Sequence, residues 1–71
     1  MNQDNVIAVL IGLLNDKSNL DTRIAAADAL GYTGFTGGRT ALLQIIEDNQ
    51  ETEDLRHAAI RALGRTVYSS K

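Results

Sequence analysis

Apolar side chains recur along this chain at intervals of three and four residues, and short polar stretches separate the runs in which they do so. Spacing of this kind places apolar side chains on one face of an α-helix, whereas the alternation of period two that marks a β-strand is nowhere sustained. Proline, which interrupts helices, is absent. The pattern therefore predicts four helices, over about residues 4–15, 20–30, 38–48 and 53–63.

One phrase of the sequence occurs twice. Residues 23–31 read RIAAADALG and residues 56–64 read RHAAIRALG, an offset of 56 − 23 = 33 residues. A period of about 20 to 50 residues is typical of stacked repeats, each of which buries its apolar face only against a neighbour. The sequence thus predicts an all-α domain, an α-solenoid of two helical hairpins in right-handed superhelical stacking. Its predicted parts are repeat one (about 4–31), a linker (about 32–37), repeat two (about 38–64) and a C-terminal tail (65–71).

Glycines and threonines mark the predicted ends of these helices. We expect Gly31 to take the left-handed conformation that ends the second helix, and Gly64 to stop the fourth. Thr36 and Thr52 are predicted to cap the starts of the third and fourth helices.

Positions that are the same in both copies predict the core. On the second helix of each repeat they form an alanine-rich face, which lets helix axes approach closely. This face consists of Ala25, Ala26, Ala29 and Leu30 in the first copy and Ala58, Ala59, Ala62 and Leu63 in the second.

The two copies differ most on their first helices. When the offset of 33 is applied there, an apolar stripe corresponds to a polar one that we expect to face solvent. The apolar stripe is Ile7, Ile11 and Leu14, and the polar one is Thr40, Gln44 and Glu47. Leaving such side chains exposed forfeits roughly 1.5–3 kcal/mol each, so we expect something to cover the stripe.

Three interpretations of the stripe remain open. The chain's own Phe35, Val67 or Tyr68 would fold over it, or two copies would pair stripe to stripe in a two-fold homodimer, or a different protein would bind it. The first leaves no function for the stripe, and the other two make it a binding surface.

Composition and charge exclude several classes of function. Seven basic and nine acidic residues give a net charge of −2, and the basic residues are scattered, which disfavours nucleic acid as a partner. Without cysteine and with one histidine, the chain has no disulfide and no zinc site. The apolar run over residues 6–14 is too short for a membrane span, and the leader MNQDN lacks the basic residues of a targeting signal. We expect a cytoplasmic protein with no membrane contact, metal or cofactor.

Candidate chemistry is sparse. His57 is the one side chain whose ordinary pKa lies near neutrality, and Glu53 lies one helical turn before it, a spacing typical of surface electrostatics. No serine has the flanking residues of a nucleophile, and the glycine-rich linker lacks the GxxxxGK phosphate-binding pattern. We therefore predict no catalytic residue.

The doubled RxAAxxALG phrase, with a leucine-rich helix before it and Asp16 seven residues before Arg23, resembles the HEAT-like repeats of the phycobilisome lyase type over about residues 6–67. The resemblance implies an interior ladder of aspartate and arginine, here Asp16, Arg23 and Arg56. In the second copy Asn49 stands at the position equivalent to Asp16, with Asp48 one residue earlier. Some proteins of this type attach or isomerise bilins on phycobiliproteins, some help to dismantle the antenna, and many are scaffolds.

The resemblance also implies that the second helices line a concave surface where ligands dock. Here that row is Leu20, Ile24 and Ala27 in repeat one and Glu53, His57 and Ile60 in repeat two, with Arg61 alongside. The other interpretation is that Ile24 and Ile60 pack between the repeats.

These observations predict a small protein-interaction module or scaffold without catalysis of its own. Its predicted partner-binding residues are Ile7, Ile11, Leu14, Leu20, Ile24, His57, Ile60 and Arg61. The alternative is an accessory subunit of a bilin lyase or isomerase, or a phycobilisome assembly or degradation factor, which would act with a larger partner related to the phycobiliproteins. Chromophore carboxylates would require convergent arginines, for which only Arg56, Arg61 and Arg65 are close in sequence.

Overall fold

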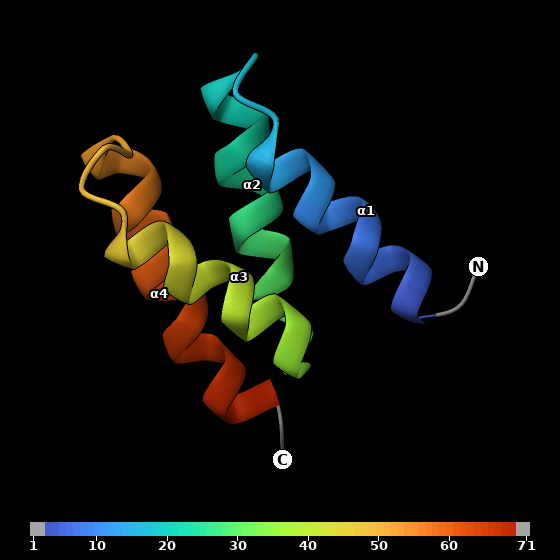
Figure 1. Cartoon of the computed structure of the whole chain (residues 1–71). Helices are drawn as coiled ribbons and strands as arrows, with labels where there is room; N and C mark the ends of the chain where they lie inside the picture. Colours follow the sequence, from blue (N-terminus) through green and yellow to red (C-terminus); the bar gives the residue numbers. More distant parts are fainter. Residues whose placement is uncertain (1–2, 70–71) are drawn as a thin grey trace.

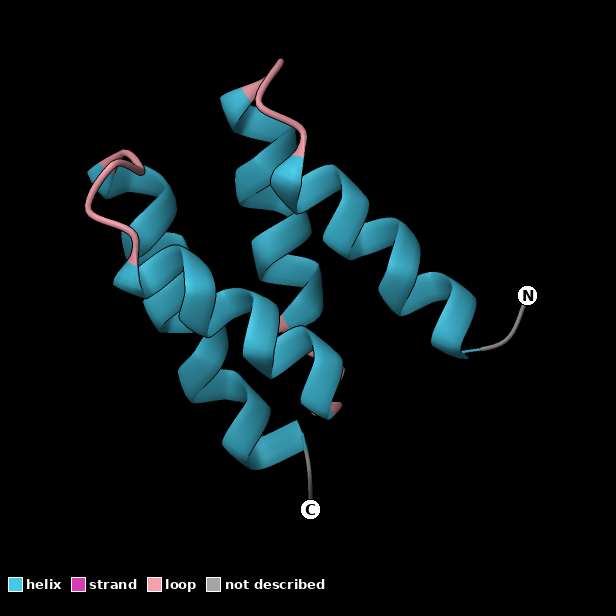
Figure 2. Ribbon diagram, viewed as in Figure 1, coloured by secondary structure: helices cyan, strands magenta, loops and turns pink. Residues whose placement is uncertain are grey.

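Four α-helices form two stacked hairpins in the computed structural model, which describes residues 3–69 (Figure 1). The helices are α1 (Gln3–Asn15), α2 (Leu20–Leu30), α3 (Thr36–Glu47) and α4 (Glu53–Ser69). Within residues 3–69 there is no β-strand (Figure 2). The turns of both hairpins lie at the same end of the molecule, at the top of Figure 1. The prediction of an all-α fold built from two helical hairpins is confirmed.

The roles predicted for two glycines are wrong. Gly31 keeps a right-handed helical conformation, with φ −63° and ψ −20°, and the positive φ of 69° falls on Gly34 in the linker. Gly64 lies inside α4, which continues to Ser69, so residues 65–69 of the predicted tail are helical. The helix continues because Thr66 is fully buried and Arg65 bonds to α2, so these residues are held against the rest of the fold.

The helix starts follow capping rules at two of the three loops. The backbone N–H of Thr22 donates to the Asn19 side chain at the start of α2, and that of Leu55 donates to the Thr52 hydroxyl at the start of α4, as predicted for Thr52. The prediction for Thr36 is wrong, because Thr36 is already the first residue of α3 and the preceding residue makes no side-chain cap.

Hydrogen bonds show that two different offsets relate the repeats. Asp16 accepts from the backbone N–H of Ser18 and Asp48 accepts from that of Gln50, which gives an offset of 48 − 16 = 32 for the hairpin turns and the first helices. The helix caps Asn19 and Thr52 give 52 − 19 = 33 for the second helices. The second turn is therefore one residue longer, and the residue without a counterpart in the first turn is Glu51.

The core lies where α2 and α4 meet each other and their hairpin partners. Contacts between α2 and α4 are extensive, whereas α1 and α3 touch at few residues. Because the stack is tighter on the α2/α4 side, these two helices form its inner side and α1 and α3 the outer one. The core residues are Leu14, Ala26, Ala27, Leu30, Ala41, Leu42, Ile45, Leu55, Ala58, Ala59 and Ala62.

The predicted alanine face is only partly confirmed, because Ala29 and Leu63 are half-buried and one position of the face is exposed. Ala25 is exposed and Ala27, two positions on, is fully buried in its place. In the second copy the counterpart of Ala25 is Ala58, which is fully buried, while the counterpart of Ala27 is Ile60, which is 51% exposed. The difference arises because each second helix meets the other on one side only. The side of α2 that carries Ala27 and the side of α4 that carries Ala58 form the contact.

One point of this contact leaves no room for a side chain. A Cβ atom on Gly31 would lie 2.8 Å from the Cα atom of Ala62 and 2.9 Å from its Cβ and carbonyl oxygen. Since the backbone of Gly31 is helical, any residue could adopt its conformation, and the requirement for glycine is steric. On Gly64, the corresponding glycine of the second copy, a Cβ atom would meet nothing within 4 Å beyond its own helix backbone.

We predict opposite effects for two matched substitutions, Gly31→Ala and Gly64→Ala. Alanine in a helix is more stable than glycine by about 0.5–1 kcal/mol, so Gly64→Ala is expected to raise the free energy of unfolding. Gly31→Ala pushes a methyl group into the backbone of Ala62 and is expected to lower that free energy by about 1–3 kcal/mol. Urea denaturation of both variants in dilute solution measures the difference. A Gly31→Ala protein as stable as the wild type would disprove the close approach of α2 and α4.

Candidate functional site

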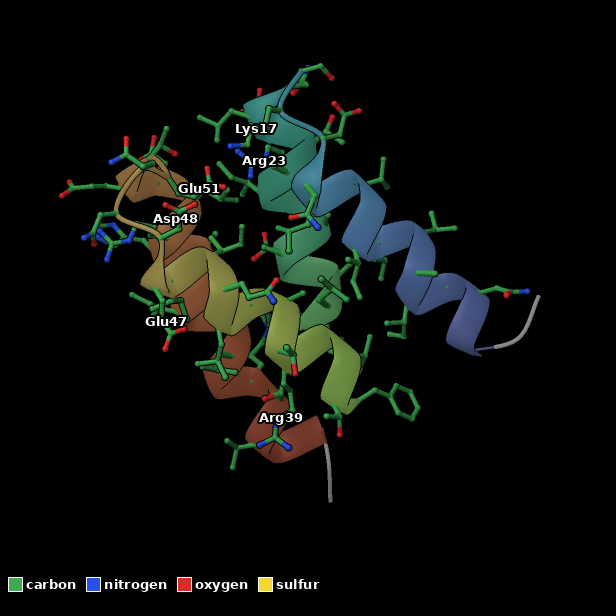
Figure 3. The ribbon with its side chains drawn as sticks, in the orientation of Figure 1. Lys17, Arg23, Arg39, Glu47, Asp48 and Glu51 are labelled. Atoms are coloured by element: carbon green, nitrogen blue, oxygen red, sulfur yellow. The ribbon has the colours of Figure 1, made fainter. Side chains whose placement is uncertain are left out.

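A buried arginine joins the two hairpins. Arg23 is 5% exposed, and its Nε donates to the carbonyl oxygen of Leu14 at 2.7 Å. Its Nη1 and Nη2 atoms donate to the two carboxylate oxygens of Glu51 at 2.9 and 2.6 Å. Figure 3 shows the side chains of Arg23 and Glu51 pointing toward each other between the two turns. Arg23 thus links α2 to the end of α1 and to the turn of the second hairpin.

The expected ladder of Asp16, Arg23 and Arg56 is not what the structure contains. The carboxylate that pairs with Arg23 belongs to Glu51, the extra residue of the second turn. Asp16 instead accepts a hydrogen bond from the backbone of its own turn. Arg56 donates through Nε and Nη2 to the carbonyl oxygen of Ile46, at 3.1 and 3.0 Å. Both arginines therefore hold the end of the first helix of their hairpin, but only Arg23 also binds the other repeat.

Two acidic groups have pKa values below their ordinary range. The hydrogen bonds from Arg23 lower the pKa of Glu51, with a further contribution from the charges of Arg23 and Lys17, and against the opposing effect of burial. The backbone and side-chain hydrogen bonds of Ser18 lower the pKa of Asp16, which is exposed. The charge of Arg23 also lowers the pKa of Asp16, as the smallest of its causes, but only Glu51 of the two is hydrogen-bonded to Arg23 across the contact between the repeats.

A second, weaker contact joins α4 to α2. The Nη2 atom of Arg65 donates to the backbone oxygen of Asp28 at 2.9 Å and lies 3.3 Å from its carboxylate. The guanidinium group also lies 4.6 Å from the centre of the Tyr32 ring, a cation–π geometry. Because the side chains of Arg65 and Asp28 are 31% and 46% exposed, solvent screens this ion pair and it contributes little stability.

The stripe of Ile7, Ile11 and Leu14 is not an exposed surface. Leu14 is fully buried, and Ile7 and Ile11 are half-buried against the core. The prediction failed because the first helices are related by 32 residues. The true counterparts of the stripe are Arg39, Leu43 and Ile46. Leu14 is thus excluded as a partner-binding residue in this fold.

The start of α3 lies beside the stripe. A Cβ atom on Gly37 would lie 3.7 Å from Ile7, and a shallow groove along Ile7 and Ile11 is bordered by Phe35, Thr36 and Gly37. Of the covers considered, Phe35 therefore lies at the edge of the stripe, where it is 43% exposed. Val67 borders a different groove, and the side chain of Tyr68 lies outside what the structure describes.

Of the row predicted on α2 and α4, four residues share one side of the two helices, whereas Ala27 is fully buried. Leu20 is 37% exposed, His57 and Arg61 are exposed, and Ile24 is half-buried against the core. Ile24 and His57 are counterparts at the offset of 33, so they lie on the same side of their two helices. We name Leu20, Ile24, His57 and Arg61 the inner face.

Ile60 departs from this row. Its counterpart Ala27 is fully buried where α2 meets α4, yet Ile60 is 51% exposed. The interpretation that Ile24 and Ile60 both pack between the repeats is therefore wrong for Ile60, which lies on the far side of α4 from α2.

Two apolar surfaces escaped the sequence reasoning, one at each end of the stack. The first end face, on α1 and α2, consists of Val6, Val9, Leu13, Ala25 and Ala29. The second end face, on α3 and α4, consists of Leu43, Ile60, Leu63, Gly64 and Val67. A signal for the first existed in the spacing of Val6, Val9 and Leu13 at i, i+3 and i+7, which marks a separate helix face.

Chemistry other than binding finds little support in these residues. The side chain of His57 makes no hydrogen bond or ion pair with the side chains that the structure describes, and the described residues hold no group of three or more potential metal ligands. Arg56 and Arg65 are committed to carbonyl oxygens, so the three arginines do not converge on a carboxylate-binding site. None of the described helices has the length and apolar character that a membrane span requires.

Comparison with known proteins gives one result. The family model for HEAT repeats matches residues 2–70, nearly the whole chain. The match is to HEAT repeats in general and does not distinguish the phycobilisome lyase type. Neither the curated proteins nor the solved structures contain a match to this chain.

We predict that Glu51→Gln lowers the free energy of unfolding at pH 7 by about 1.5–3 kcal/mol, because Arg23 keeps its charge and loses the carboxylate. The lowered pKa means that the folded state binds this proton less readily than the unfolded chain. The contribution of Glu51 is therefore complete above about pH 4.5 and is lost as the pH falls through its folded pKa.

Urea denaturation between pH 7 and pH 3 measures this effect, with Glu47→Gln, a charge removal at an exposed position of α3, as the control. The stability gap between wild type and Glu51→Gln is expected to narrow toward zero at acid pH. A gap that does not change with pH would show that the charge of Glu51 does not stabilise the junction.

Proposed function

This chain belongs to the HEAT-repeat family, and from that we propose that it is a small protein-interaction module that acts as a scaffold and has no catalysis of its own. HEAT repeats generally serve as scaffolds for protein interactions, because stacked helix pairs create a continuous surface along the stack. In the two repeats of this chain, we infer that this surface lies on the inner side formed by α2 and α4.

The observation that supports the proposal is the composition of the inner face. Leu20 and Ile24 give it an apolar strip on α2, and His57 and Arg61 give it basic groups on α4. Half-exposed aliphatic side chains beside an exposed arginine match the apolar centre and polar rim of protein interfaces. We infer a partner segment that places an apolar side chain against Leu20 and Ile24 and an acidic group near Arg61.

A role beside a bilin lyase, or in the assembly or degradation of phycobilisomes, would be one form of this function. It is supported only by the likeness of the doubled RxAAxxALG phrase to repeats of the phycobilisome lyase type. In such a role the chain would contact a phycobiliprotein or a larger enzyme.

A matched pair of double variants tests the inner face. Leu20→Glu with Arg61→Gln changes the inner face, and Thr40→Glu with Gln44→Glu changes exposed positions on the outer side of α3. Each pair alters the net charge by −2. We expect the wild type and the outer variant to capture the same protein from the native lysate. Calorimetry with that protein is expected to show an affinity for the inner variant at least about tenfold lower than for the wild type. A tenfold difference corresponds to about 1.4 kcal/mol of binding free energy.

Thermal unfolding of both double variants confirms first that each is folded. Equal binding of the wild type and the inner variant would contradict the assignment of the inner face. Loss of binding in the outer variant alone would move the partner to α3.

A further inference from the structure

We propose that the two end faces of the stack bind each other, so that copies of this chain associate head to tail. The second end face of one copy (Leu43, Ile60, Leu63, Gly64 and Val67) receives the first end face of the next (Val6, Val9, Leu13, Ala25 and Ala29). The apolar residues of these end faces are separate from Leu20 and Ile24 of the inner face, so the proposal does not depend on the partner proposed above.

The junction between the two repeats within one chain is the template for this contact. Each repeat has one side that faces the repeat before it and another that faces the repeat after it. Where the two repeats meet, both sides are buried: Ala27 and Leu30 of the first repeat and Ala41, Ile45, Ala58 and Ala62 of the second are each at most 6% exposed. The same two sides occur once more, one at each end of the stack, and there Val9, Leu43 and Ile60 are 52%, 42% and 51% exposed.

The counterparts at the ends remain apolar. On the second end face, Ile60 replaces Ala27 and Leu63 replaces Leu30. On the first end face, Val9 replaces Ala41, Leu13 replaces Ile45, Ala25 replaces Ala58 and Ala29 replaces Ala62. Val9 and Ile60 are 52% and 51% exposed, and a marginally stable domain of this size has little capacity for idle apolar surface.

Two grooves, one between the hairpins and one at the second end face, make the correspondence more specific. Within the chain, Ile7, Ala8 and Ile11 line a groove whose other wall is the start of α3. The counterparts of these three residues, Arg39, Thr40 and Leu43, line a groove with Leu63 and Val67 at the second end face. No described element of the chain enters this second groove from outside. In a head-to-tail contact, α1 of the next copy would lie there, as α3 lies against the first groove.

Gly64 gives an independent indication that another helix approaches from outside. Glycine weakens a helix relative to alanine, and Gly64 lies inside α4 without a positive φ. A side chain there would meet nothing within 4 Å, so the chain's own packing does not require a glycine. Its counterpart Gly31 is required because it touches Ala62. In the proposed contact Gly64 meets Ala29 of the next copy, which is the counterpart of Ala62.

The charged positions are also compatible. Within the chain, Arg65 binds Asp28 and lies over the ring of Tyr32. At the junction between copies, Arg61 of the first copy stands at the position of Asp28. Tyr32 of the next copy stands at the position of Arg65. Tyr32 is 70% exposed, so Arg61 of one copy can stack on Tyr32 of the next in the cation–π geometry that Arg65 already shows.

Two differences make the contact between copies weaker than the contact within the chain. The first turn has no counterpart of Glu51, so the ion pair with Arg23 is not reproduced by Arg56. In addition, Val6 replaces Gly38, where a Cβ atom would lie 3.1 Å from the Thr33 hydroxyl and 3.2 Å from the Leu30 side chain, so α1 of the next copy must sit farther out. We therefore expect association that is reversible and depends on concentration.

A contact between unlike faces predicts a distinctive result on mixing. Sedimentation velocity of the full chain is expected to show a mass that rises with concentration beyond a dimer, since each copy retains a free end. Val9→Glu blocks the first end face and Ile60→Glu blocks the second, and each variant alone is expected to be monomeric. An equimolar mixture of the two is expected to form a 1:1 dimer and nothing larger, because one intact face of each kind remains.

Three results would overturn the proposal. They are a wild type that stays monomeric from micromolar to millimolar concentration, a single variant that still dimerises, which indicates a two-fold contact, or a mixture that forms no dimer. The single substitution Leu20→Glu changes the inner face and leaves both end faces and Arg61 intact, so unchanged association of this variant separates this proposal from the partner proposed above.

A pair of glycine substitutions provides a test that does not add charge. Gly64→Ala is expected to stabilise the monomer and yet to weaken association at least fivefold, because the methyl group occupies the point of closest approach to Ala29. Gly12→Ala, at an exposed glycine of α1 outside both end faces, is expected to stabilise the monomer and to leave association unchanged. Equal association of both variants would contradict the proposed geometry.

Discussion

The position of the two hairpins depends on one buried cation. An arginine side chain removed from water must have its charge paired and its N–H groups hydrogen-bonded, or the fold loses several kcal/mol. Arg23 meets this requirement with groups from two other places in the chain, the end of α1 and the turn after α3. The need to satisfy one side chain thus constrains both hairpins at the end where their turns lie.

At the other end of α2, the contact between the hairpins depends on residues with a small side chain or none. Alanines and Gly31 allow α2 and α4 to approach until backbone touches backbone, while α1 and α3 stay farther apart. Small residues on one side and larger aliphatic residues on the other therefore determine which surface is the inner one. That asymmetry places Leu20, Ile24, His57 and Arg61 on the inner side and leaves an apolar face at each end of the stack.

Helix positions and the repeat were predictable because they depend on local spacing and on a phrase that occurs twice. The faces of the first helices were not, because Glu51 lengthens the second turn and changes the offset from 33 to 32. A shift of one residue rotates a helix face by about 100°, which is why Ile7, Ile11 and Leu14 were assigned to the surface and lie against the core. Ile60 was misplaced for another reason. Its exposure depends on which side of α4 meets α2, and helical periodicity alone does not show this.

A double-mutant cycle on Arg23 and Glu51 tests most directly the claim that their ion pair joins the hairpins. Free energies of unfolding are measured for wild type, Arg23→Met, Glu51→Gln and the double variant. The bond from Arg23 to Leu14 is lost in both variants that lack the arginine, so it cancels in the coupling energy. We predict a coupling of at least about 1.5 kcal/mol at pH 7, within the range for interacting neighbours. A coupling near zero would contradict the account.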